Sequence, residues 1–258
     1  MVSLRRELRR GTRIAGFGAV TGAMLPVFLA HEALASDELG RAAVRDKWVG
    51  AWCGALLRLF GVRVLLHGAL PERGRAHLVV ANHRSTADIL VLLRAFGGHM
   101  VSRADLARWP LVGVAARSVG TVFVDRASAS SGAAAVRAIR TRLEEGSTVI
   151  VFPEGTTFPG DEVRPFHAGA FLGALHSGAD VVPVGLAYGT GSGAQFVAES
   201  FPAHLARMAA AAPSRVAMCV GRPIAVDAKA RAAHVREAAR AEVQRLVRDA
   251  RELVDRRG

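Results

Sequence analysis

Cysteine is nearly absent from this chain of 258 residues, which contains only Cys53 and Cys219. Two cysteines cannot build the disulfide framework of a small secreted domain, and they fit a reducing cytosol. The histidines are scattered without the spacing of zinc ligands, so we predict no metal site. The chain also lacks a Gly-x-Ser-x-Gly elbow, which leaves a serine hydrolase without support.

Lysine and aromatic residues are scarce as well. Aromatic side chains form 6% of the sequence, and Lys47 and Lys229 are the only lysines among 34 basic residues. Arginine therefore carries nearly all of the formal net charge of +12. Because no nucleic-acid motif accompanies this charge, we predict no nucleic-acid partner. A basic surface suits anionic membrane lipids and acidic partner proteins instead.

An uncharged run from Ile14 to Ala30 lies near the N-terminus. Its 17 residues reach the short limit for crossing a bilayer. Five arginines precede the run, namely Arg5, Arg6, Arg9, Arg10 and Arg13. The following Ala33-Leu34-Ala35-Ser36 is similar to a signal-peptidase site, so a cleaved signal is an alternative. We favour a retained anchor with the arginines on the cytoplasmic side of a bacterial-type inner membrane.

A second N-terminal segment, Trp48 to Phe60, has apolar residues at helical spacing. It is either an interfacial helix that docks on lipid or an amphipathic helix that packs on the core. We predict that residues 1–60 form a basic segment with membrane-associated helices. Residues 61–258 are long enough for one α/β domain.

Short apolar runs alternate with helical stretches along the rest of the chain. This alternation predicts an α/β fold with a mixed, largely parallel sheet flanked by helices. The predicted strands are 63–67, 78–81, 100–102, 121–124, 148–152, 181–187 and 216–220. The predicted helices are 86–96, a partly irregular 104–118, 130–145, 168–177, 203–211 and 230–255. Pro183 interrupts one strand and predicts that this strand lies at an edge or carries a bulge.

The run Asn82-His83-Arg84-Ser85-Thr86-Ala87-Asp88 follows the predicted strand 78–81 and leads into a helix. On one continuous helix, the side chains of His83 and Asp88 would point about 140° apart. They meet only if His83 lies in the turn and Asp88 in the first turns of the helix. The serine or threonine between them can cap that helix.

A histidine paired with a carboxylate is suited to general-base chemistry. Imidazole titrates near neutrality, so His83 can take a proton from an alcohol. A carboxylate on the other ring nitrogen, here Asp88, would fix the tautomer and stabilise the imidazolium. An isolated pair of this kind is also typical of a core histidine beside a helix-capping aspartate.

Two further strands end in polar groups. The stretch Phe152-Pro153-Glu154-Gly155-Thr156-Thr157 forms a turn that can bind an anion or an oxyanion. Gly120 to Arg126 ends the other strand, and Arg126 can grip a phosphate or pair with Asp125. Open α/β sheets bind ligands at the carboxyl ends of their strands, so we expect these groups near His83.

Four stretches together resemble the glycerolipid acyltransferase family, of the type that acylates lysophosphatidic acid and lysophospholipids. They are Asn82-His83 with Asp88, Gly120 to Arg126, Phe152 to Thr156 and Val182-Pro183-Val184, and the resemblance covers about residues 45–225. It implies transfer of a fatty acyl group from acyl-coenzyme A or acyl carrier protein to a lipid hydroxyl in phospholipid biosynthesis. It also implies a pair of N-terminal helices. We predict no cofactor beyond the acyl donor itself.

The resemblance also implies roles for individual residues. His83 is the base and Asp88 orients it. Arg126, Glu154, Gly155 and Thr156 shape the acceptor site. We add Asn82, Ser85 and Thr157 as predicted substrate-binding residues.

Thr157 departs from the pattern of that family. Members that use lysophosphatidic acid commonly have an arginine here, so a fixed cation for the acceptor phosphate is missing. Arg126 or Arg164 can replace it, or the acceptor is another lysolipid such as lyso-ornithine lipid. We predict lysophosphatidic acid as the acceptor and phosphatidic acid as the product, with other lysolipids as the alternative. A protonated His167 is a further candidate contact for an anion, although an ordinary loop histidine fits that position better.

The predicted reaction needs no acyl-enzyme. His83 deprotonates the acceptor hydroxyl, and backbone amides near Gly155 or at the helix start after His83 hold the oxyanion.

Two other functions stay open: a non-catalytic lipid-binding module, which would not need His83 near Asp88, and a thioesterase-like hydrolase. The predicted partners are anionic membrane lipid, a lysolipid and acyl carrier protein, with the site facing the cytoplasm.

Overall fold

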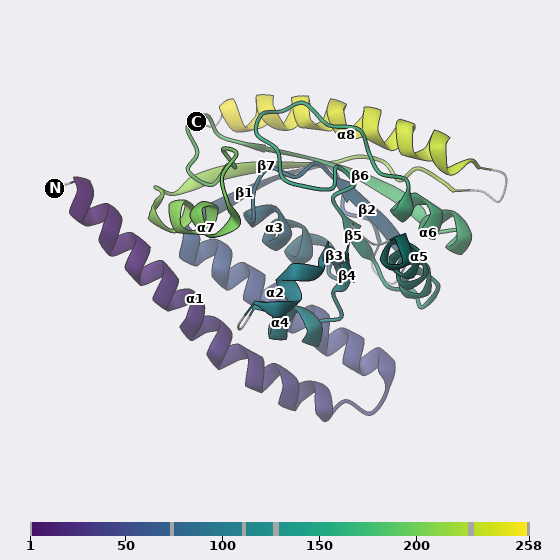
Figure 1. Cartoon of the computed structure of the whole chain (residues 1–258), viewed down its shortest axis with the longest axis horizontal. Coiled ribbons are helices and arrows are strands. Elements are labelled where there is room, and N and C mark those ends of the chain that lie inside the picture. Colours follow the sequence, from purple (N-terminus) through teal and green to yellow (C-terminus); the bar gives the residue numbers. More distant parts are fainter. Residues whose placement is uncertain (1, 73–74, 110–111, 126–128, 227–229, 257–258) are drawn as a thin grey trace.

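A seven-stranded sheet organises the chain (Figure 1). The structure is a computed structural model that describes residues 2–72, 75–109, 112–125, 129–226 and 230–256. The strands are β1 (Val62–His67), β2 (His77–Ala81), β3 (His99–Arg103), β4 (Val122–Val124), β5 (Val149–Val151), β6 (Asp180–Tyr188) and β7 (Ser214–Val220). They lie in the order β1-β7-β6-β2-β5-β3-β4; β6 and β7 are antiparallel, and the other neighbouring pairs are parallel. The sheet is mixed and largely parallel, which confirms the predicted fold class.

Helices cover both faces of this sheet (Figure 1). They are α1 (Val2–Ala33), α2 (Glu38–Phe60), α3 (Ala87–Phe96), the 3-10 helix η1 (Ala104–Arg108), α4 (Val112–Ser118), α5 (Ala129–Glu144), α6 (Gly169–Ser177), α7 (Phe201–Ala210) and α8 (Ala232–Asp255). Alternate side chains of a strand point to opposite faces. In β2, Val79 and Ala81 join the core with α2 and α3, while Leu78 and Val80 join the core with α5, α6 and α8. All four are fully buried, as expected of a central parallel strand.

Pro183 lies in a central strand, so of the two predicted positions, an edge or a bulge, the edge is wrong, whereas the pairing with β7 does shift by one residue at Pro183, as at a bulge. Its strand, β6, runs between β2 and β7. On the β7 side, the antiparallel ladder starts only at Val184, and Val181 pairs beyond it with Ile224. Pro183 sits in the gap between these two pairings, where its carbonyl accepts from the Gly221 N–H. The absent proline N–H therefore removes no ladder bond.

The N-terminal helices α1 and α2 form an antiparallel pair beside the sheet (Figure 1). The stretch Leu4–Ala33 of α1 is long and apolar enough to cross a membrane by length and composition, and only 11% of its most apolar window is buried. Helix α2 begins well before the predicted Trp48, because Asp37 caps it by accepting from the Gly40 N–H at 2.7 Å. The apolar stripe of α2 packs into the core, which favours the second interpretation of that segment.

Arg13 joins α1 to the two helices that it crosses. Its guanidinium donates to Leu59 O of α2 at 2.9 Å and, at the end of α7, to Ala209 O at 3.2 Å and Ala211 O at 2.6 Å. The last carbonyls of a helix have no partner within the helix and carry the negative end of its dipole. A buried cation at this position satisfies them and fixes α7 against α1.

Candidate active site

His83 and Asp88 are in direct contact at the carboxyl end of β2. His83 lies in the turn after β2, Asp88 lies in the first turn of α3, and His83 Nδ1 is 3.0 Å from Asp88 Oδ2. The Asp88 side chain is fully buried, whereas the His83 side chain keeps 14% of its surface exposed. Since Nδ1 bonds to the carboxylate, Nε2 is the ring nitrogen left to meet a substrate.

The Asp88 carboxylate is held on both oxygens. Oδ2 also accepts from the backbone N–H groups of Arg84 and Ser85 at 2.6 and 2.7 Å, so Asp88 caps the turn that carries His83. Oδ1 accepts from the hydroxyl of Tyr188 at 2.6 Å. Burial, and next the charge of Asp88, raise the pKa of Tyr188 well above its ordinary value, so the phenol stays a neutral donor.

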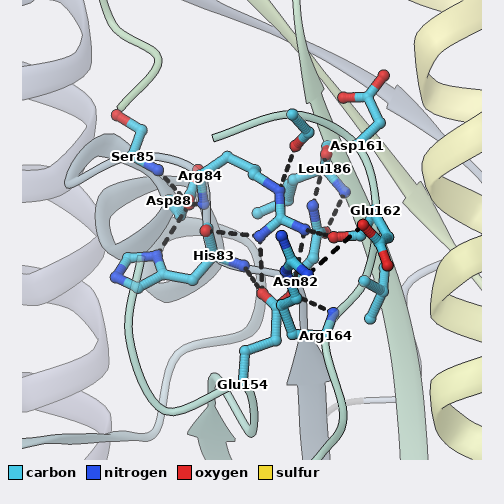
Figure 2. A network of polar contacts seen from close by, with 12 residues as sticks. Asn82, His83, Arg84, Ser85, Asp88, Glu154, Asp161, Glu162, Arg164 and Leu186 are labelled. Carbon is cyan, nitrogen blue, oxygen red and sulfur yellow. Dashed lines mark hydrogen bonds and ion pairs between the residues drawn. The ribbon is translucent and has the colours of Figure 1, made fainter. Parts of the chain in front are cut away.

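Glu154 and Arg84 form a buried ion pair behind His83 (Figure 2). The two Arg84–Glu154 hydrogen bonds measure 2.8 and 3.0 Å, and Glu154 Oε2 also accepts from the His83 N–H at 2.7 Å. Glu154 Oε1 accepts from the Arg164 N–H at 2.8 Å. The predicted acceptor-site residue Glu154 thus lies inside the protein, where it joins the turn after β5 to the turn after β2. Sequence reasoning missed Arg84, because an arginine inside a polar motif reads as a surface residue.

Asn82 and Ser85, both predicted to bind substrate, are also fully buried. The Asn82 amide bonds to both the N–H and the carbonyl of Leu186 in β6 at 2.8 and 2.9 Å, which fixes the end of β2 on its neighbour (Figure 2). Ser85 Oγ donates to Ala194 O at 2.5 Å and accepts from the Ala87 N–H at 3.1 Å. Their donors and acceptors are used within the protein, so both residues hold the loop and do not face the cavity.

A cavity of about 790 Å³ opens in front of His83. Its walls come from the carboxyl ends of the adjacent parallel strands β2, β5, β3 and β4, as expected for an open α/β sheet. Gly155, Thr156 and Thr157 line it, as do the half-buried His83 and the Phe152 ring that stacks on the imidazole at 3.9 Å. His167 also lines the cavity, whereas Arg126 lies outside the described residues.

A second, smaller cavity adjoins the first. Its volume is about 190 Å³, and its walls are almost entirely apolar side chains of α1, α2, α3, α4 and α7. Six residues line both cavities: Thr86, Ile89, Met100, Ser102, Leu106 and Phe201. His83 therefore borders a larger cavity of mixed polarity, which is joined by a smaller and almost wholly apolar one.

Four of the backbone amides near Gly155 and after His83, at the predicted oxyanion site, already donate to other groups. The Gly155 N–H donates to Phe152 O at 3.1 Å, and the Thr86 N–H donates to His204 Nε2 at 3.2 Å. The two amides between His83 and Thr86 donate to Asp88, as described above. This prediction is therefore wrong for these amides, because their N–H groups form hydrogen bonds within the protein. The side chains of Thr156 and Thr157 still face the cavity.

These features define a member of the acyltransferase family. The family model described as Acyltransferase matches residues 63–187. The chain is 34% identical over 189 residues to a lyso-ornithine lipid O-acyltransferase of Pseudomonas aeruginosa. The aligned region covers 71% of this chain and 69% of that protein. The chain belongs to this family, which confirms the resemblance read from the four stretches.

Other relatives are acyltransferases of two kinds, named for two different acceptor lipids. A lyso-ornithine lipid O-acyltransferase of Rhizobium meliloti is 36% identical over 53% of this chain, and a 1-acyl-sn-glycerol-3-phosphate acyltransferase of Neisseria gonorrhoeae is 34% identical over 46%. The chain spans about half the length of these two relatives, 46% of each. The crystal structure of the 1-acyl-sn-glycerophosphate acyltransferase PlsC from Thermotoga maritima shares the fold, with a TM-score of 0.76 at 22% identity over 96% of this chain and 97% of that one.

Proposed function

We propose that this protein transfers a fatty acyl group from acyl-coenzyme A or acyl carrier protein to the free hydroxyl of lysophosphatidic acid, giving phosphatidic acid. The observation that carries the proposal is the His83–Asp88 pair, whose free Nε2 borders the larger cavity. A non-catalytic lipid-binding module would have no need for a carboxylate with both oxygens bonded behind a histidine.

In this mechanism, the acceptor hydroxyl hydrogen-bonds to His83 Nε2 and loses its proton as its oxygen attacks the thioester carbonyl. The new O–C bond forms, the C–S bond breaks, and the thiolate takes the proton from the imidazolium. Asp88 keeps Nδ1 protonated and stabilises the positive charge on the ring. The hydroxyls of Thr156 and Thr157 are the donors that we assign to the oxyanion. Both cysteines are buried, and burial raises the pKa of Cys53 to about 12, so this thiol stays protonated and is a poor nucleophile.

The adjoining apolar cavity suits the fatty acyl chain, because its wall includes the apolar faces of α1 and α2 that lie nearest to lipid in this proposal. We propose that residues 1–60 associate with the membrane through α1, whose apolar surface is largely exposed. The arginines before Ile14 then lie beside anionic head groups at the cytoplasmic surface.

Lyso-ornithine lipid is the second candidate acceptor, and the absence of an arginine at position 157 favours it. Among the described residues that line this cavity, Arg103 is the one arginine, and it pairs with Asp105 at 2.9 Å. Asp125 and Glu199 line the same cavity. With Thr157 in place of an arginine, the described residues of this cavity offer no arginine beyond the paired Arg103, which suits an amine-bearing head group better than a phosphate dianion.

One assay separates these functions. Purified full-length protein in detergent would receive one labelled acyl donor and a panel of lysolipids, with free fatty acid measured beside acylated lipid. Acylated lysophosphatidic acid supports the first proposal, and acylation of lyso-ornithine lipid alone selects the second. Free fatty acid as the only product would identify a hydrolase. His83→Ala should lower transfer by about 10²–10⁴-fold, and a variant with near-normal transfer would refute the assigned base.

A further inference from the structure

A second histidine–carboxylate pair lies at the same cavity as His83. His204 of α7 has Nδ1 3.0 Å from Glu199 Oε1, and both residues line the larger cavity. His204 is 2% exposed, and Glu199 is itself bonded to Arg207 at 2.6 Å. The two pairs differ in one respect: the Nε2 of His83 is left for a substrate, whereas the Nε2 of His204 is already bonded.

The partner of His204 Nε2 is the backbone N–H of Thr86, at 3.2 Å. Thr86 is the N-cap residue of α3, and its own side chain makes no capping bond there. The first N–H groups of a helix have no partner within the helix, so an acceptor from elsewhere must supply one. His204 provides that acceptor for the N–H of Thr86, which lies three residues after His83 in the sequence. A neutral ring is required, with the proton on Nδ1 toward Glu199; burial, the largest cause, lowers the pKa of His204 and favours that form.

The chain around His204 reinforces the same loop. Phe196 donates its N–H to Arg84 O at 2.8 Å, and Ala194 O accepts from Ser85 Oγ. The Phe196 ring packs edge-on against the His204 imidazole at 5.7 Å. Helix α7 is in turn fixed at its end by Arg13 of α1. The loop that carries His83 thus rests on β6 on one side and on the 194–204 segment on the other.

We propose that His204 is a positioning residue for acyl transfer, which holds the His83 loop by accepting the Thr86 N–H. This inference rests on the proposed function. His204 does not act as the base, because its Nε2 lone pair is occupied by the amide. Its contribution is to keep the turn between β2 and α3 in the geometry that directs His83 Nε2 into the cavity.

The test compares three variants of the full chain in the acyl-transfer assay. His204→Met removes the acceptor at similar volume, and we expect kcat to fall by about 10- to 100-fold with the KM for lysolipid nearly unchanged. His204→Gln places a side-chain oxygen near the position of Nε2, so it should restore most of kcat. His176→Met, on the exposed face of α6 and away from both cavities, is the matched control and should behave as wild type.

Hydrogen exchange gives a readout independent of activity. Amides of residues 84–88 should lose protection in His204→Met and regain it in His204→Gln. If His204→Met fails to fold, Glu199→Gln, which weakens the anchor of the imidazole, should produce the same fall in kcat. Wild-type kcat and unchanged protection in His204→Met would overturn this inference, as would a change in KM alone. Wild-type protein that acylates no lysolipid would instead refute the proposed function.

Discussion

The hydroxyl of Tyr188, the only tyrosine in the chain, donates a 2.6 Å hydrogen bond to Oδ1 of Asp88. Tyr188 ends β6 and Asp88 begins α3, so the bond connects two elements 100 residues apart. It occupies the carboxylate oxygen that does not face His83. The orientation of His83, the proposed base, therefore depends on a residue outside all four stretches that carry the resemblance to the family.

Removing that hydroxyl tests this dependence. Tyr188→Phe keeps the ring and its packing, but it leaves Asp88 Oδ1 buried without its donor. We expect the free energy of unfolding to fall by about 1–3 kcal/mol and kcat to fall with little change in KM. Urea unfolding and steady-state kinetics would measure the two effects. Full stability together with full activity would show that the bond is dispensable.

The Arg84–Glu154 pair predicts a large loss from a small change. Glu154→Gln keeps the shape of the side chain but leaves the buried Arg84 cation without its counter-charge. A buried charge that loses its partner costs about 3–5 kcal/mol of stability. Since Glu154 also fixes the His83 N–H, we expect activity to fall with stability. Glu144→Gln, on the exposed surface of α5, is the control, and equal stability losses in both variants would contradict the prediction.

Thr157→Arg probes the preference for the acceptor. A cation at this position would face the larger cavity and attract the phosphate of lysophosphatidic acid. We expect the ratio of kcat/KM for lysophosphatidic acid over lyso-ornithine lipid to rise about tenfold or more, which corresponds to about 1.4 kcal/mol. Thr157→Gln, which adds bulk without charge, should leave the ratio near that of wild type. An unchanged ratio in Thr157→Arg would remove position 157 from the head-group site.

Two buried histidines predict a loss of stability in mild acid. Burial is the largest cause that lowers the pKa of His99 and of His204 below 6.5, and Arg45 and Arg142 add to the effect at His99. The unfolded chain then binds protons near pH 6.5 that the folded chain does not, so stability is full above pH 6.5 and falls as the pH drops below it. Urea midpoints between pH 7.5 and about 5 would measure the slope.

A variant identifies the source of that slope. His99→Gln should flatten the dependence on pH, even though it weakens the bonds of His99 to the carbonyls of Val119 and Gly120. The Glu199 carboxyl, whose pKa is lowered chiefly by its bond to Arg207, loses its contribution only at lower pH, below about 4.5. An identical slope in wild type and His99→Gln would show that His99 does not contribute.

The helices and strands follow largely from the periodicity of apolar residues, whereas the contacts of the site do not. Each of the seven predicted strands is present within two residues, because short apolar runs between helices leave little choice of element. The strand order is different in kind. The pairing of β7 with both β1 and β6 rests on contacts far apart in sequence, so the proline in β6 indicates an irregular pairing but not the position of the strand in the sheet.

The site residues divide along the same line. The spacing of His83 and Asp88 constrains their geometry, and the structure has the pair in contact. Polarity at a strand end does not tell whether a side chain faces a cavity or another part of the chain. Asn82, Ser85 and Glu154 therefore read as substrate contacts, although their partners lie within the fold. No local pattern marks Tyr188 or His204, since each reaches the loop from a different element.

Arg13 has a consequence for how this protein can be handled. A version shortened to begin after α1 would gain solubility in water, yet the carbonyls of Leu59, Ala209 and Ala211 would lose the guanidinium that they share. Because His204 of α7 bonds to the loop that carries His83, we expect removal of α1 to lower the acyl-transfer activity as well. The apolar helix α1 thus also stabilises the packing of α2 and α7, so detergent or nanodiscs suit the study of this protein better than truncation.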